Sequence, residues 1–103
     1  MRVAAMFSGW GGRRGLAMHD AVRALAVAEA RIAVQRLALG DWSGALMSAT
    51  RAEAEAALIG WAPMVSAAER LQARAVAGEL REAERVARVE FDMSGALMSW
   101  GLW

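Results

Sequence analysis

The amino-acid sequence predicts an all-α fold, a small antiparallel bundle of three to four helices with flexible, aromatic-bearing termini. The 103-residue chain is rich in Ala and has one Pro, a composition that favours helix over strand. Two similar segments, Gly40–Ala45 and Gly78–Ala83, each begin with a Gly followed by an acidic residue. Gly is favoured just after a helix and an acid near the start of the next one, so both segments predict tight turns between helices.

The first two expected elements are a Gly-rich arm at residues 1–15, which carries Phe7 and Trp10, and a helix over residues 17–39. The apolar residues of this helix fall on two sides. One side carries Val22, Val27, Val34 and Leu37, and the other carries Leu25, Ile32 and Leu39. A helix that is apolar on two sides is usually sandwiched, so we expect neighbours on both sides of residues 17–39.

The next elements are a turn formed by Gly40, Asp41, Trp42 and Gly44, and a helix over residues 43–59. Either Asp41 or Ser43 caps this helix, because both side chains are good acceptors for the first free backbone N–H groups. Trp42 is expected to be buried in the corner between the first two helices, the alternative being an exposed binding anchor. The inward-facing residues are expected to be Leu46, Met47 and Leu58 together with several Ala.

Pro63 follows Gly60-Trp61-Ala62, and this group predicts a break, because Pro disfavours helix in the residue before it. A third helical region is expected over residues 64–92, either as one helix or divided in two by a turn at Gly78. Its apolar residues with a spacing of three and four predict the inner face, and they are Ala73, Val76, Leu80, Ala83 and Ala87.

Residues 93–103 form an uncharged tail that carries Trp100, Leu102 and Trp103. The predicted organisation is therefore an arm at 1–15, a helical domain at 16–92 and an apolar tail at 93–103. The hexapeptide of residues 43–48 recurs at 94–99. The two copies are either equivalent docking elements or a coincidence in a chain of restricted composition.

Residues that could carry catalysis are few. The chain has no Cys, which excludes a disulfide, a thiolate metal site and a thiol nucleophile. The single His, His19, has only Asp20 as a polar neighbour in sequence. The paired carboxylates are accompanied by Arg at helical spacing, which is typical of a solvated face. We therefore expect no enzymatic activity, no metal site and no cofactor.

The composition predicts a protein partner instead. Net charge is +1, all twelve basic residues are Arg, and they are not gathered as in a nucleic-acid-binding protein. Hydrophobic residues make up 57% of the chain, which favours a partner chain or a homo-oligomer; contact with a membrane surface is the less favoured alternative. The expected partner-binding residues are Phe7, Trp10, Trp100, Leu102 and Trp103. No targeting segment is evident, so we expect a cytoplasmic protein or one exported without a cleavable signal peptide.

Three resemblances accompany this interpretation. The turn at Trp42-Ser43-Gly44, in a helical chain of this length, resembles the Trp-X-Gly helical-hairpin family of small proteins exported by type VII secretion systems. The segments Gly40-Asp41-Trp42 with Ala45 and Gly78-Glu79-Leu80 with Ala83 are similar to the helix pairs of tetratricopeptide repeats. The order of helices, with a break at Pro63, resembles the flagellar export-chaperone family.

All three resemblances imply a small helical protein that buries apolar surface against another chain. The sequence thus predicts a non-enzymatic adaptor or chaperone-like protein, and the resemblances to the type VII and flagellar export families imply a connection with secretion. The alternatives are a structural subunit of a larger assembly and a helical protein associated with the membrane interface.

Overall fold

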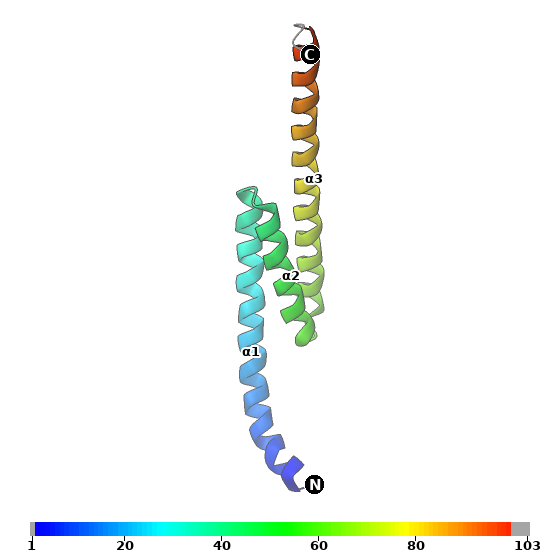
Figure 1. Ribbon diagram of the computed structural model, residues 1–103. Helices are drawn as coiled ribbons and strands as arrows, with labels where there is room; N and C mark the ends of the chain where they lie inside the picture. Colours follow the sequence, from blue (N-terminus) through cyan, green and yellow to red (C-terminus); the bar gives the residue numbers. More distant parts are fainter. Residues whose placement is uncertain (1, 100–103) are drawn as a thin grey trace.

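The computed structural model describes the backbone of residues 2–99 and the side chains of residues 17–95. Three helices and no strand occur in this part of the chain: α1 (Arg2–Ala38), α2 (Trp42–Leu58) and α3 (Ala62–Ser99). The predicted all-α class is confirmed. Figure 1 shows α2 between the two longer helices, with α1 extending past it at one end and α3 at the other.

The core is made of alanine. On α2, Ala45, Ala49, Ala52 and Ala56 follow each other at intervals of four, three and four residues, and each is at most 1% exposed. Their buried counterparts are Ala26 and Ala33 on α1 and Ala68 and Ala75 on α3, each pair seven residues apart. Because α2 packs against both other helices, and these contact each other little, α2 is the sandwiched helix. The expectation that residues 17–39 are sandwiched is wrong.

The large apolar residues expected inside lie mostly outside. Met47 is 53% and Leu58 is 79% exposed, while Leu46 is half-buried. Small side chains let helix backbones approach closely, and larger ones are then displaced to the edges of the contact. Other residues of the expected inner faces that are exposed include Leu25, Val34, Leu39, Ala73, Val76, Leu80, Ala83 and Ala87.

The turn between α1 and α2 is closed by backbone hydrogen bonds around Gly40. Gly40 has a φ of 74°, in the left-handed region that Gly adopts without strain. Its N–H donates to the Leu37 carbonyl at 3.1 Å, and the Asp41 N–H donates to the Arg36 carbonyl at 2.8 Å. These two hydrogen bonds together form the Schellman motif, which satisfies the last carbonyls of α1.

The turn between α2 and α3 repeats the same geometry twenty residues later, around Gly60. Gly60 has a φ of 66° and donates to the Ala57 carbonyl at 3.1 Å. The Trp61 N–H donates to the Ala56 carbonyl at 2.8 Å. The break predicted at Gly60–Pro63 is therefore confirmed as the second turn. The prediction of a turn at Gly78 is wrong, because Gly78 lies within α3, which is one unbroken helix.

Both long helices exceed their expected bounds. The first was predicted to begin at residue 17 but begins at Arg2, and the third was predicted to end at residue 92 but continues to Ser99. Extending an existing helix adds one hydrogen bond for each residue fixed, whereas a Gly costs only about 1 kcal/mol relative to Ala. The Gly residues near both ends are therefore accommodated within helix.

The alanine core predicts a sharp contrast between two neighbouring positions of α2. Ala52 is fully buried, whereas Ala54 is exposed. Ala52→Leu should lower the free energy of unfolding by roughly 1–3 kcal/mol through overpacking. The control Ala54→Leu should change it by less than about 0.5 kcal/mol. Urea denaturation followed by circular dichroism measures both, and equal midpoints for the two variants would contradict the close approach of the helices.

Candidate functional site

Trp42 joins the first turn to α3. It is the first residue of α2, and its ring lies directly against Gly78, so closely that a Cβ at Gly78 would lie 2.5 Å from two ring carbons. Its Nε1–H donates a hydrogen bond to a carboxylate oxygen of Glu82, one helical turn further along α3. Trp42 is half-buried and its role is structural, but it fastens the turn to the third helix rather than closing the corner of the first two.

The turn itself is held by Arg36 and Asp41. Arg36 donates from Nη1 to the Gly44 carbonyl at 3.0 Å and to the Ser48 hydroxyl at 2.9 Å. The Asp41 carboxylate accepts from the Gly44 N–H at 3.1 Å and is thus the cap of α2, and it lies 3.9 Å from the Arg36 guanidinium. A side chain at Gly44 would collide with this carboxylate, which explains the glycine there.

Beyond Trp42, α3 projects from the body of the molecule as an arm, which we define as Glu79–Met93. Every residue of the arm is exposed. Figure 1 shows this part of α3 extending beyond the α1–α2 turn without a neighbouring helix. Large apolar residues occur along it, including Val86 (48% exposed), Val89 (53%) and Met93 (61%).

One side of the arm forms an acidic notch with the α1–α2 turn. The notch is lined by apolar Ala83, Val86 and Ala87 and by four carboxylates, with no basic side chain. The carboxylates belong to Asp41, Glu79, Glu82 and Glu90. This surface therefore combines apolar contact area with negative charge.

A second hollow, the basic groove, lies between α1 and α3 and has a volume of about 650 Å³. Val27 and Val34 of α1 and Met64 and Leu71 of α3 give it an apolar lining. A further hollow along the same two helices reaches Trp42. The charged residues lining the two hollows are all arginines, Arg31, Arg70, Arg74 and Arg81.

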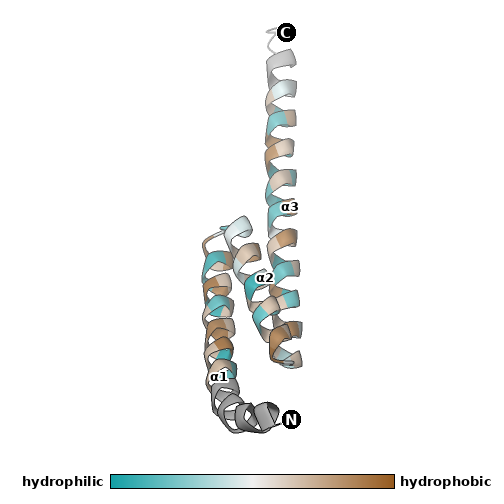
Figure 2. Cartoon of the chain, turned by 60° about the horizontal axis from the view of Figure 1, so that its bottom comes forward, coloured by the Kyte–Doolittle hydropathy of each residue, from teal (hydrophilic) through white to brown (hydrophobic). Residues whose placement is uncertain are grey.

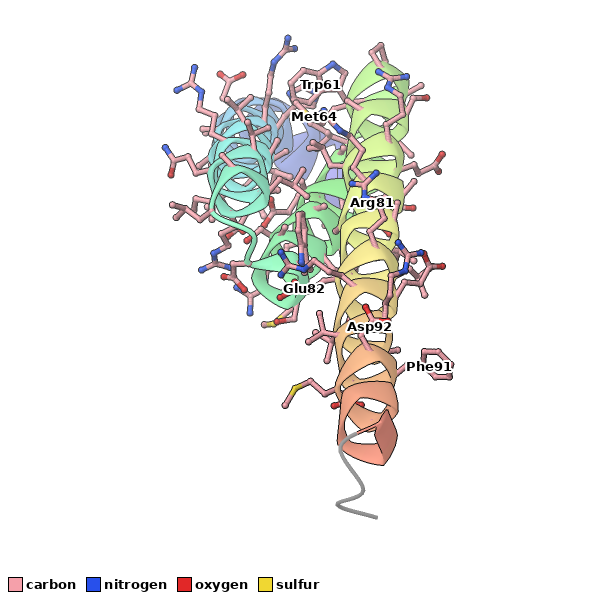
Figure 3. The ribbon with its side chains drawn as sticks, turned by 90° about the horizontal axis from the view of Figure 1, so that it is seen from above. Trp61, Met64, Arg81, Glu82, Phe91 and Asp92 are labelled. Carbon is pink, nitrogen blue, oxygen red and sulfur yellow. The ribbon has the colours of Figure 1, made fainter. Side chains whose placement is uncertain are left out.

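At the far end of the groove, the guanidinium of Arg23 lies 4.3 Å from the centre of the Trp61 ring. Figure 3 shows Trp61 and Met64 in the space between α1 and α3. A cation this close to an aromatic face is attracted to it, so the pair ties α1 to the start of α3.

Some charges of α3 line separate hollows, but all charged residues of α3 are exposed, and Arg and Glu remain mixed along the rest of its surface. Arg70, Arg74 and Arg81 line the groove, whereas Glu79 and Glu90 line the notch. Figure 2 shows hydrophilic and hydrophobic positions alternating along the whole of the arm. Spacings of four, seven and eleven residues place Arg70, Arg74 and Arg81 on one helical face, and a spacing of eleven residues places Glu79 and Glu90 on another.

The pKa of Glu55 on α2 is displaced from its ordinary value. Burial raises the pKa of Glu55 above its ordinary value of 4.5, the nearby Glu29 carboxylate raises it further, and Arg51 lowers it. One oxygen of Glu55 is buried without a hydrogen-bond partner. By contrast, the neighbouring Glu53 accepts a hydrogen bond from Gln72 and so links α2 to α3.

The predicted partner-binding residues are not tested by these features. Trp100, Leu102 and Trp103 lie outside the described residues, and for Phe7 and Trp10 only the helical backbone is described. His19 is at the surface, with Nδ1 4.0 Å from the Asp20 carboxylate. The two copies of the hexapeptide can be compared at their first two positions: Ser43 is exposed and Gly44 is half-buried, whereas Ser94 is half-buried and Gly95 is exposed.

Comparisons with known proteins add no family: the chain matches no protein-family model, no curated protein and no solved structure. Within the part of the chain that the structure describes, no group of carboxylates or His could hold a metal ion. None of the helices, over the same residues, contains an apolar stretch long enough to cross a bilayer.

The contact between Trp42 and Gly78 gives a prediction with a control in the same helix. Gly78→Ala places a methyl group against the Trp42 ring, and the displaced ring should cost roughly 1–3 kcal/mol, more than the gain in helix propensity. At Gly95 a new Cβ meets open space, so Gly95→Ala should be neutral or stabilising by up to about 1 kcal/mol. Thermal denaturation measures both changes. Stabilisation by Gly78→Ala would show that Trp42 does not lie on this glycine.

The raised pKa of Glu55 predicts a pH dependence. The folded chain binds the proton of the Glu55 carboxyl more tightly than the unfolded chain does. The contribution of Glu55 to the free energy of unfolding is therefore greatest below pH 4.5 and falls as the pH rises through the raised pKa. Glu55→Gln should remove that part of the slope, and Glu69→Gln, at an exposed position, should retain it. Urea midpoints from about pH 4 to about pH 8 test this. Parallel pH profiles for wild type and Glu55→Gln would contradict the prediction.

Proposed function

We propose that this protein is a non-enzymatic helical adaptor that binds another polypeptide through the arm of α3. The observation that carries the proposal is the continuation of the α3 packing face beyond its neighbours. Ala68 and Ala75 pack in the core and are seven residues apart. The same spacing of seven residues, continued along α3, reaches Val89 on the arm. A helical face that is buried over one half and exposed over the other fits a surface completed by a second chain.

Neighbouring positions support the same proposal. Val65 and Gln72 lie at the half-buried edge of the core, and their row continues on the arm as Glu79, Val86 and Met93. The arm thus offers adjacent apolar positions on one side, the pattern by which an amphipathic helix anchors in a partner's groove. The terminal residues Trp100, Leu102 and Trp103 would extend this surface in sequence.

The resemblances to secreted Trp-X-Gly hairpins and to export chaperones agree with such a role, since both imply a helical protein that binds another chain. A structural subunit of a larger assembly is the alternative. The open arrangement of the helices favours it, because α1 and α3 each extend past the body at opposite ends (Figure 1). In either case the arm is the surface of contact.

Site-specific photo-crosslinking tests this proposal in cells that make the protein. A photoreactive phenylalanine replaces Val89, and the matched control places it at Glu69, an exposed position of α3 within the body. We expect ultraviolet light to give a covalent adduct with a second polypeptide at position 89 and none at position 69. The mass of the adduct identifies that polypeptide, either a second copy or a different protein. Failure to form any adduct at position 89 would refute the proposal.

A further inference from the structure

We infer that the arm of one copy of this chain binds in the basic groove of a second copy. This inference rests on the proposed function and names the partner. On its notch side the arm presents apolar residues among carboxylates, whereas Arg81, Arg85 and Arg88 of the arm do not line the notch. The groove presents apolar residues among guanidinium groups. The two surfaces are complementary both in polarity and in charge.

The charged groups of both surfaces are available to form ion pairs with a second copy. None of Arg31, Arg70, Arg74, Glu79 and Glu90 forms an ion pair within 4.0 Å with another residue that the structure describes. Each of these residues is exposed. A second copy can therefore supply their counter-ions without breaking existing pairs.

The lengths of the groove and of the arm also agree. Below the arm, the basic groove and the further hollow together extend along α3 from Met64 to Ala77, about 20 Å at 1.5 Å per residue. The arm, Glu79–Met93, is about 22 Å long on the same basis. A helix in the groove would contact α1 and α3 together, two helices that otherwise contact each other little, and would complete a four-helix arrangement.

The arm cannot reach the groove of its own chain. It is the direct continuation of α3, and α3 is itself one wall of the groove. Folding back would require a break in a helix that is continuous from Ala62 to Ser99. The complementary surfaces can therefore meet only between copies.

A nucleic acid or an anionic membrane would also be attracted to the arginines, but neither accounts for the apolar lining by Val27, Val34, Met64 and Leu71. An apolar groove with a charged rim is typical of sites for amphipathic helices. The acidic notch of the arm supplies that chemistry within the same chain, whose net charge is only +1.

Sedimentation velocity of four purified proteins tests the inference. They are the wild type, a groove variant (Arg70→Glu with Arg74→Glu), an arm variant (Glu79→Arg with Glu90→Arg) and the combined variant with all four changes. All of these positions are exposed, and none lies in the Trp42 contact. The combined variant keeps the wild-type net charge, so it controls for charge as such.

We expect the wild type to associate at low ionic strength, with affinity falling at least about tenfold in 0.5 M NaCl as the pairs are screened. The groove variant and the arm variant should each sediment as the 11.0 kDa monomer, and an equimolar mixture of the two should associate. The combined variant should regain self-association, because its reversed surfaces are again complementary. A control with Glu69→Arg and Glu84→Arg, on another face of α3, should associate like the wild type.

A monomeric wild type at low salt would overturn the inference, as would a combined variant that stays monomeric. An arm variant that associates like the wild type would show that the arm is not the occupant of the groove. None of these results would refute the proposed function if position 89 still cross-links to a different protein. The two proposals can therefore fail separately.

Discussion

Close approach of the helices through alanine is the constraint on which the rest of the molecule depends. Each fully buried hydrophobic side chain in the described chain is an Ala, and the one buried polar side chain, Ser48, is equally small. A buried methyl group removes little apolar area from water, so such a core gains stability from tight packing rather than from large buried side chains. The larger apolar residues are left at the edges, where a second chain can contact them.

The direction of the arm follows from the same constraint. Gly78 continues the series of small residues on α3 at the level of the first turn, and the Trp42 ring fills the space that the missing side chain leaves. With Trp42 also bonded to Glu82, the turn is fastened to α3 at two points one helical turn apart. Beyond that level neither α1 nor α2 lies beside α3, which continues alone (Figure 1). Trp42 thus marks the boundary between body and arm, and it lines both the acidic notch and the hollow that continues the basic groove.

The sequence was sufficient for the helical class and for the first turn, because Gly40 and Asp41 act through local geometry and capping. It was insufficient for the orientation of the helices. Leu and Met dominate a hydrophobicity pattern, whereas here Ala45, Ala49, Ala52 and Ala56 mark the inner face and Met47 is exposed. Gly78 was mistaken for a turn because a glycine that admits an aromatic ring and one that ends a helix look alike in sequence. The acidic lining of the notch was missed because Glu79 and Glu90 stand among arginines in the sequence, and only the position of the α1–α2 turn shows that they line one hollow.

The presence of an acidic notch and a basic groove in a nearly neutral chain bears on the contact between copies that we infer. Opposite charges on separate surfaces attract between copies without a large net charge to oppose association. Contact between an arm and a groove joins two different surfaces, so each copy retains one free groove and one free arm until the assembly closes on itself. Two copies close it when each arm fills the other groove; otherwise the contacts repeat along an open chain. In the contact that we infer, the continuous helix α3 would set the angle between successive copies and would thereby decide between a closed and an open assembly.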